Sequence, residues 1–189
     1  KMLVSASTFK DEVGTDSANS LYKDVKKNHW AVEYIKIAVE QGWMTGYSDG
    51  TFRPSNTIRY EEAATAVLKL LGYDPSTFAG NFPSAQISKF ESLSLADGTS
   101  LKKGTTLTRN DCVNIFYNLM NADDTNGAKY ATKLGYTVTS TGEISYSSLV
   151  SNELKGPYVY ESGDLFANIP FSSAILWFKL SCSSNTSTM

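Results

Sequence analysis

The sequence predicts a mainly α-helical fold, made of two tandem helix–loop–helix repeats and a small mixed region after them. Apolar residues recur with helical spacing in four segments, and glycine ends the first two of these segments. The same order of helix, turn-rich loop and helix returns after about fifty residues, which is typical of an internal repeat. We therefore expect a helical bundle or prism, followed by a small α+β or irregular C-terminal region.

The composition is typical of a globular chain and disfavours two classes of protein. Of the 189 residues, 41% are hydrophobic and 19% are charged, which is too apolar for a disordered chain. The net charge of −2 is unlike that of a nucleic-acid-binding domain. The longest apolar run, Ala174–Leu180, is far shorter than the roughly 20 residues that cross a bilayer. We expect neither nucleic-acid binding nor membrane insertion.

The first repeat is predicted over residues 22–74. Residues 1–21 are polar and poorly periodic, and we interpret them as a tail or an irregular wrap over the first folded unit. Asn28 is the expected N-cap of a helix over residues 29–41, where apolar side chains share one face. Gly42 supplies the left-handed residue at the exit of this helix.

The loop after the first helix is dense in Gly, Asp and Pro, which excludes a helix and requires tight turns. We expect Gly50 to adopt a positive φ in a turn with Asp49. Phe52 is expected to pack beneath that turn, and Arg53 to pair with a helix carboxylate. The residues predicted to shape the loop are Gly46, Asp49, Gly50, Phe52 and Arg53.

The second helix of this repeat is predicted over residues 60–71, where apolar residues form a stripe and Gly72 ends the helix. Glu61 and Glu62 fall in its first turn, where the helix dipole favours negative charge. Glu62 is accordingly a candidate helix-capping residue.

The second repeat is predicted over residues 75–122, with a short first helix over residues 84–93. Thr108 is the expected N-cap of its second helix. Asp111, at the third helical position, is expected to reach back to the cap as in a capping box.

The remaining chain is rich in Gly, Thr, Ser and Tyr, and we interpret residues 123–171 as a small mixed connector or an incomplete third unit. Short extended segments are expected at residues 136–139, 143–146 and 158–160, with a short helix over residues 147–154. Residues 172–189 fit no upstream pattern and are interpreted as an irregular tail.

Catalytic and metal-binding patterns are weak. His29 is the single histidine, and no Ser or Cys nucleophile lies in a recognisable elbow. Cys112 and Cys182 are distant and give no zinc spacing, and Cys112 is expected to be a buried thiol. Ser48-Asp49-Gly50 is similar to part of a calcium or dockerin-like loop, but the spaced Asp/Asn series and the closing Glu are missing. We expect no enzyme, metal or cofactor.

The first repeat closely resembles the S-layer homology motif. The resemblance is carried by Tyr22-Lys23-Asp24-Val25, by His29-Trp30-Ala31 and by Gly46-Tyr47-Ser48-Asp49-Gly50-Thr51-Phe52-Arg53-Pro54. The family pattern continues as Ile-Thr-Arg-x-Glu. Here it reads Ile58-Arg59-Tyr60-Glu61-Glu62, so Arg59 replaces the Thr and Tyr60 replaces the Arg. The second copy is degenerate at its start but keeps the Thr-Arg pair as Thr108-Arg109.

The resemblance implies a fold and a function. Proteins of this family usually carry three such motifs, which pack into a pseudo-threefold prism and bind an anionic wall polysaccharide in grooves between neighbouring motifs. Two motifs are recognisable here, over residues 22–122, so the prism is completed by residues 123–171, by self-association with a second chain, or not at all. The implied function is non-covalent anchoring of a secreted protein to secondary cell-wall polysaccharide, outside a Gram-positive cell.

A polysaccharide groove needs a flat aromatic side chain for the apolar face of a sugar, a carboxylate or amide for its hydroxyls, and a cation for an acid group. The resemblance offers Trp30, Asp24 and Arg109 for these three tasks. Other roles compete: Trp30 as a core or lid residue and Asp24 as a brace for the loop. The alternative function is a protein–protein interaction or connector module of a larger surface protein that binds no sugar.

Overall fold

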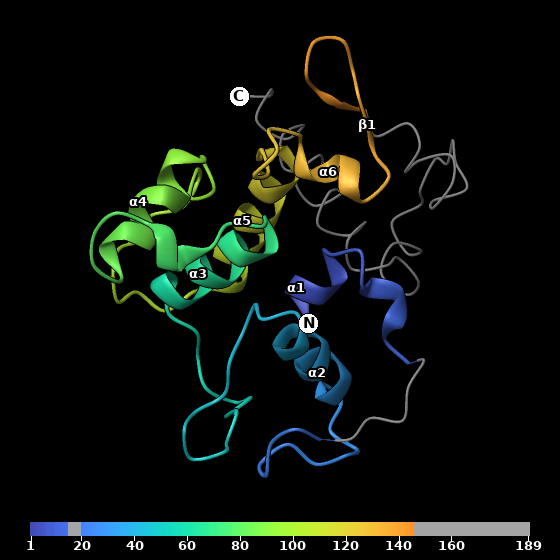
Figure 1. Ribbon diagram of the computed structural model, residues 1–189, viewed down its shortest axis with the longest axis vertical. Coiled ribbons are helices and arrows are strands. Elements are labelled where there is room, and N and C mark those ends of the chain that lie inside the picture. The colour runs from blue at the N-terminus through green and yellow to red at the C-terminus, as the bar shows by residue number, and fades with distance from the viewer. Residues whose placement is uncertain (15–19, 146–189) are drawn as a thin grey trace, which may run out of the picture.

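The computed structural model describes residues 1–14 and 20–145. These residues form short helices around one main hydrophobic core, with a two-stranded hairpin at the end of the molecule opposite α2 (Figure 1). The elements in chain order are α1 (Met2–Ser5), η1 (Lys10–Glu12), α2 (Val32–Glu40), α3 (Tyr60–Leu70), η2 (Pro75–Thr77), α4 (Ser84–Ser92), α5 (Arg109–Asn121), α6 (Tyr130–Lys133), β1 (Thr137–Val138) and β2 (Ile144–Ser145).

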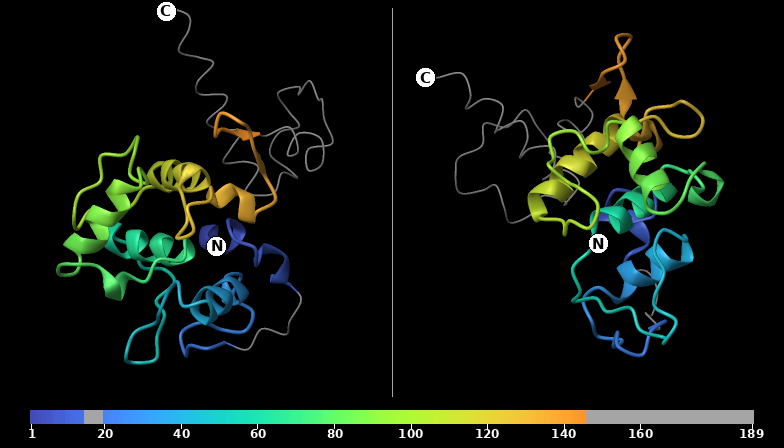
Figure 2. Two further views of the ribbon diagram at one scale, coloured as in Figure 1. Left: turned by 45° about the horizontal axis from the view of Figure 1, so that its top comes forward. Right: turned by 90° about the vertical axis from the view of Figure 1, so that its left-hand side faces the viewer.

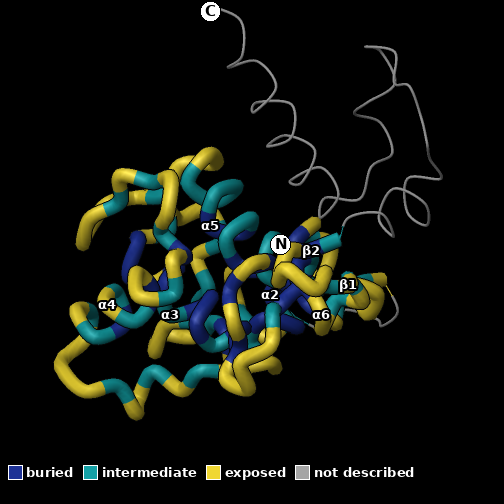
Figure 3. The backbone as a smooth tube through the Cα atoms, turned by 90° about the horizontal axis from the view of Figure 1, so that it is seen from above, coloured by how far each residue is buried: buried dark blue, intermediate teal, exposed yellow. Residues whose placement is uncertain are grey.

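The helices pack in three pairs: α1 with α2, α3 with α4, and α5 with α6. The contact between α1 and α3 joins the first pair to the second. In the left view of Figure 2, α2 (light blue) and α4 (green) lie on different sides of the molecule. Buried segments gather where the helices meet, and the loops are largely exposed (Figure 3). The prediction of a mainly helical fold with a small C-terminal region is confirmed.

The first residues of the chain belong to the core and are not a tail. Val4 has no exposed surface and lies in the main core with Ala6. The Tyr130 hydroxyl donates a hydrogen bond of 2.8 Å to the Ala6 carbonyl, so α6 and the chain start close over the same core. Four residues of α1 are too few to show helical periodicity in the sequence, which explains why the pattern suggested a tail or an irregular wrap.

The first predicted helix begins later than expected, at Val32, and Asn28 does not cap it. The chain before it makes tight turns, in which the His29 carbonyl accepts from the Val32 N–H at 3.0 Å. The His29 ring accepts from the Ala31 N–H at 3.2 Å, which holds the turn closed. Gly42 has a φ of 71° and provides the predicted left-handed exit.

A backbone bridge joins the start of α3 to the start of α5. We call the antiparallel contact of residues 58–60 with residues 105–107 the inter-repeat bridge. The Tyr60 N–H donates to the Thr105 carbonyl at 2.8 Å, and the Leu107 N–H donates to the Ile58 carbonyl at 3.1 Å. Tyr60 is fully buried, with its ring edge-on to Phe90 at 5.7 Å between centroids. The second helices of the two repeats, α3 and α5, therefore begin next to each other at this bridge.

Both second helices have polar starts. The Asp111 carboxylate accepts from the Thr108 N–H at 2.8 Å, and the Asp111 N–H donates to the Thr108 hydroxyl oxygen at 3.2 Å, which forms a capping box. At α3 the Glu62 carboxylate accepts from the Arg59 N–H at 2.8 Å. An arginine side chain has no acceptor to return this bond, so α3 keeps one half of a capping box.

The segment after α5 continues the same fold. Asp124, with a side chain only 2% exposed, pairs with Lys133 at 2.8 Å and accepts from the Asn126 and Ala128 N–H groups at 2.8 and 3.1 Å. The strands β1 and β2 pair antiparallel within two of the predicted extended segments. The predicted helix over residues 147–154, the extended segment at 158–160, the tail over 172–189 and Cys182 lie outside the described residues.

Replacing Asp124 with Asn is predicted to lower the free energy of unfolding at pH 7 by about 2 kcal/mol, because the change removes a buried charged acceptor. The hydrogen bond from Lys133, with those from the backbone, lowers the pKa of Asp124 to about 2. A carboxyl group with a lowered pKa stabilises the fold above its unfolded pKa, near 4, and this stabilisation is lost as the pH falls toward 2. Urea unfolding across pH 7 to 2 measures both effects.

The control for this change is Asp123→Asn, at a half-exposed carboxylate paired with Lys129 at 2.8 Å. Its expected effect is below about 1 kcal/mol, since exposed ion pairs contribute little. A difference between wild type and Asp124→Asn that stayed constant from pH 7 to pH 2 would contradict the assigned role.

Candidate functional site

The loop after α2 is held in shape by Asp24. One carboxylate oxygen of Asp24 accepts from the Phe52 N–H at 2.8 Å, and the other accepts from the Arg53 N–H at 2.7 Å. These bonds lower the pKa of the Asp24 carboxyl, that from Phe52 most strongly. Asp24 thus joins the segment before α2 to the far end of the loop, although it lies 28 residues away from Phe52 in sequence.

A second polar cluster closes the tip of the loop. Arg53 pairs with Asp49 at 2.8 Å, and its guanidinium lies 4.0 Å from the centre of the Tyr47 ring. The Thr51 hydroxyl and then Arg53 lower the pKa of Asp49 to about 2. The expected partner of Arg53, a helix carboxylate, is therefore wrong: its partner is in the loop. Gly50, with a φ of 77°, makes the predicted turn.

Aromatic packing supports the base of this loop. The rings of Tyr22 and Phe52 lie 5.3 Å apart, over a small cluster of buried residues that includes Val32 and Ile35. The Gly46 N–H donates to the Tyr22 hydroxyl at 2.9 Å, and a Cβ atom on Gly46 would overlap the Tyr22 ring. Phe52 packs on Tyr22 and this cluster, and the close contact with Tyr22 requires a glycine at position 46.

An open groove of about 480 Å³ lies between residues 43–58 and α3. We call it the loop groove. Tyr47 from the loop and Phe82, which precedes α4, are exposed by 45% and 62% and contribute to its lining. Its polar lining consists of Thr45, Arg53, Asn56, Thr57, Glu62, Thr65 and Lys69. Aromatic faces beside hydroxyl, amide and charged groups are suited to an amphipathic ligand such as a sugar.

Trp30 lies immediately before α2 and is 71% exposed. Its ring stacks beside His29, at 5.8 Å between ring centres, and lies 6.5 Å from Tyr34. A tryptophan in the core would be largely buried. The exposure therefore excludes a core position for Trp30 and leaves a broad aromatic face in contact with water.

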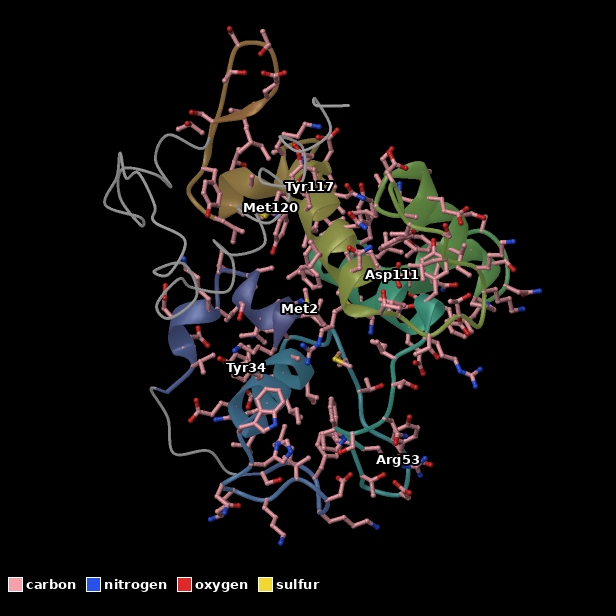
Figure 4. The ribbon with its side chains drawn as sticks, turned by 180° about the vertical axis from the view of Figure 1, so that it is seen from behind. Met2, Tyr34, Arg53, Asp111, Tyr117 and Met120 are labelled. Atoms are coloured by element: carbon pink, nitrogen blue, oxygen red, sulfur yellow. The ribbon has the colours of Figure 1, made fainter. Side chains whose placement is uncertain are left out.

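The three residues expected to bind sugar do not contact one another. Arg109 is the first residue of α5, and no hydrogen bond or ion pair joins it to Asp24 or Trp30 within residues 1–14 and 20–145. In the view of Figure 4, Met2 of α1 is drawn between Tyr34 of α2 and Asp111 of α5; α1 packs on α2 and lines a pocket together with α5. Asp24, Trp30 and Arg109 all lie outside the lining of the loop groove.

Two features of the site were missed by the sequence analysis. Phe82 was not singled out, because a lone aromatic residue in a turn-rich segment has no periodic pattern. Tyr34, which contributes to the aromatic surface around Trp30, was read only as part of a helix. Its position four residues after Trp30 was the available signal, since such residues are neighbours on a helix surface.

A smaller apolar pocket of about 230 Å³ lies among α1, α3 and α5, with Cys112 in its lining. Cys112 is a free thiol that is half-buried, whereas the sequence predicted a buried one. Its partial burial raises the pKa of the thiol. The described residues contain no cluster of three or more His, Cys, Asp or Glu suited to a metal ion. In the same residues, every helix is too short or too polar to cross a membrane.

Comparison with known proteins gives one family match. Residues 21–64 match the S-layer homology domain. This stretch contains the end of the segment before α2, α2 itself, the following loop and the first turn of α3. It covers most of the first predicted repeat, residues 22–74.

The chain is also similar to parts of larger surface proteins. It is 28% identical to the middle cell wall protein of Brevibacillus brevis over 64% of this chain and 11% of that protein. It is 35% identical to the surface layer protein of Brevibacillus choshinensis over 42% of this chain and 7% of that protein. It is 46% identical to the cellulosome-anchoring protein of Acetivibrio thermocellus over 26% of this chain and 11% of that protein. The chain thus spans a small fraction of these curated relatives.

Replacing Gly46 with Ala is predicted to destabilise the loop and the α2 region by about 1–3 kcal/mol, as expected for overpacking. The added methyl group would overlap Tyr22 and lie 2.8 Å from the Thr51 carbonyl oxygen, so both sides of the loop must move. Chemical unfolding followed by tryptophan fluorescence measures the change. Ser48→Ala, at an exposed position of the same loop, is the control and should leave stability within about 0.5 kcal/mol. Equal stability of both variants would be evidence against a tightly fixed loop.

Proposed function

Because residues 21–64 match the S-layer homology domain, we propose that this chain holds a secreted protein on the bacterial cell surface by binding wall polysaccharide without a covalent bond. The expected cell-surface location is confirmed, since the similar proteins are cell-wall and surface-layer proteins. One of them is named a cellulosome-anchoring protein, which supports anchoring in general. The names of these proteins do not say which wall component is bound, and polysaccharide is the component assigned in this proposal.

The exposure of Trp30 is the observation that carries this proposal. A tryptophan ring that remains 71% exposed in a folded module retains a large apolar face that a ligand can cover. The C–H faces of sugar rings are flat and apolar, so they stack on such a surface, while their hydroxyl groups stay hydrated. Tyr34 and His29 extend the aromatic surface on either side of Trp30.

Arg109 and Asp24 take different roles in the proposal. Arg109 is exposed and has no ion-pair partner in the part of the chain that the structure describes, so its guanidinium is free to form two hydrogen bonds with an acid group of the polymer. Asp24 already accepts two backbone hydrogen bonds. We therefore assign Asp24 chiefly to shaping the loop, with its remaining lone pairs available to a sugar hydroxyl.

The loop groove offers a second place for the same polymer. It combines exposed aromatic side chains with hydroxyl and amide groups, and its volume is within the range of small-ligand sites. Phe82 belongs to the segment of the second predicted repeat, so the groove lies between residues of both repeats. All residues that line the groove belong to this one chain.

A connector or protein-interaction module is the competing function. Exposed aromatic residues also mark protein interfaces, so the surface around Trp30 is compatible with a protein partner. Binding to protein-free wall material separates the two functions, since a connector module has no affinity for it.

In co-sedimentation with purified Gram-positive cell walls, the chain is expected to pellet, and acid extraction of the non-peptidoglycan polysaccharide is expected to abolish pelleting. Trp30→Ala and Arg109→Ala should each weaken binding about tenfold, equivalent to roughly 1.4 kcal/mol. Phe82→Ala tests the loop groove in the same assay, with a smaller expected loss.

Leu21→Ala is the matched control, because Leu21 is an exposed apolar side chain (50%) remote from α5 in sequence. It should bind like the parent chain. Pelleting that survives acid extraction, or no pelleting at all, would refute polysaccharide binding and favour the connector function.

A further inference from the structure

The turn between α5 and α6 carries Asn126-Gly127, the single Asn–Gly pair of the sequence. Backbone bonds close this turn tightly. The Gly127 N–H donates to the Asp124 carbonyl at 3.0 Å, and the Asp124 N–H donates to the Ala128 carbonyl at 2.9 Å. Gly127 has a φ of 77°, which glycine adopts without strain. We call residues 124–128 the Asn–Gly turn.

The side chain of Asn126 is accessible to reaction with the neighbouring backbone. Asn126 is exposed, and its side-chain amide has no hydrogen bond within the part of the chain that the structure describes. Thr125, Gly127 and Ala128 are exposed as well, so water reaches the whole stretch. Exposed turns open locally at little cost in free energy, which releases the Gly127 N–H from its carbonyl partner. Gly127 also has no side chain that would keep its nitrogen away from the amide carbon of Asn126.

We propose that Asn126 is a deamidation site, at which the chain converts to aspartate and isoaspartate without an enzyme. In the opened turn, hydroxide takes the proton of the Gly127 N–H, and the nitrogen forms a bond to the side-chain carbonyl carbon of Asn126. The bond from that carbon to the amide nitrogen breaks, and ammonia leaves with a proton from water, so that a cyclic succinimide remains. Water then opens the ring: cleavage at the side-chain carbonyl gives aspartate, and cleavage at the main-chain carbonyl gives isoaspartate.

Conversion in the Asn–Gly turn disturbs the fold, because this turn holds the buried carboxylate of Asp124. That carboxylate accepts from the Asn126 and Ala128 N–H groups at 2.8 and 3.1 Å and pairs with Lys133 of α6 at 2.8 Å. Isoaspartate adds one backbone carbon between the two N–H groups, so they no longer converge on one carboxylate. The new carboxylate also lies two residues from Asp124, and like charges repel. We therefore expect α6, with its hydrogen bond from Tyr130 to the chain start, to loosen.

The inference goes beyond the proposed anchoring and does not depend on it. The loss of ammonia is irreversible under ordinary conditions, so the reaction limits how long the intact module persists. Its rate depends on how often the Asn–Gly turn opens, and hence on the hydrogen bonds that Asp124 makes inside the turn.

The test incubates the full chain at pH 6 and at pH 9 and follows each asparagine by peptide mass spectrometry. A methyltransferase specific for isoaspartate labels that product. Asn28 and Asn56 are internal controls, since both are exposed but precede His29 and Thr57. Asn126→Gln is the variant control, because its longer side chain would have to close a larger ring and reacts far more slowly.

Asn126 is expected to convert about tenfold faster than Asn28 or Asn56, since a following glycine leaves the reacting nitrogen unhindered. The rate should be higher at pH 9 than at pH 6, because the nitrogen must lose its proton. Asp124→Asn, which weakens the turn, should convert faster at position 126 than the parent chain. Asn126→Gln should carry no isoaspartate label at this position.

A second measurement tests the effect on the fold. Converted and unconverted chains are separated by ion exchange and unfolded in urea. The isoaspartate form is expected to unfold at a lower urea concentration than the parent chain. Asn126→Asp adds the charge without the extra backbone atom, so its midpoint should lie between the two.

The two parts of the inference fail separately. If Asn126 converts no faster than Asn28 and Asn56, the deamidation site is refuted. If it converts but the isoaspartate form unfolds at the same urea concentration as the parent chain, the site stands and its effect on the fold is refuted. Neither result bears on polysaccharide binding, which co-sedimentation with cell walls tests.

Discussion

The backbone bridge between residues 58–60 and 105–107 is the constraint on which the rest of the structure depends. It sets the starts of α3 and α5 side by side, and it directs Tyr60 into the core against Phe90. Because two backbone hydrogen bonds and the contact of Glu61 with Gly104 occur in one short stretch, the two repeats cannot shift along each other without leaving buried polar groups unpaired. The positions of α4 and α6 follow, since each packs on one of these helices.

The loop after α2 is held in one conformation by hydrogen bonds and ion pairs among its own polar groups near the surface. Asp24 binds two backbone N–H groups, and Arg53 is held between Asp49 and the Tyr47 ring. Exposed ion pairs of this kind contribute little to global stability, but together they define one loop conformation. The wall of the loop groove is therefore formed before a ligand arrives, which lowers the entropic cost of binding.

The polar and aromatic residues of the surface fall into two groups: those whose hydrogen bonds hold the loop together, and those that remain available to a ligand. Asp24, Asp49 and Arg53 look like binding residues by type, yet their polar atoms already have partners inside the loop. Trp30 has a large exposed face, and Arg109 has no salt bridge in the described parts of the chain. Chemical type alone does not distinguish these two groups of residues. The distinction comes from which hydrogen bonds and ion pairs the fold has already formed, and it supports the surface around Trp30 as the proposed site for a sugar polymer.

The sequence by itself determined the helical class, the approximate extents of α3 and α4, the start of α5, the turn at Gly50 and the capping box of Thr108 and Asp111. These features depend on interactions between residues a few positions apart, so periodicity and turn chemistry are sufficient to predict them. The motif in residues 22–54 also indicated the family.

Only the tertiary structure decided that the first residues enter the core, that Trp30 is exposed and that Arg59 and Thr106 lie opposite each other on one bridge. The contact between Tyr130 and Ala6 joins residues 124 positions apart, and the bridge joins segments more than 40 positions apart. Such contacts depend on how helices pack in three dimensions, and no local pattern along the chain specifies them.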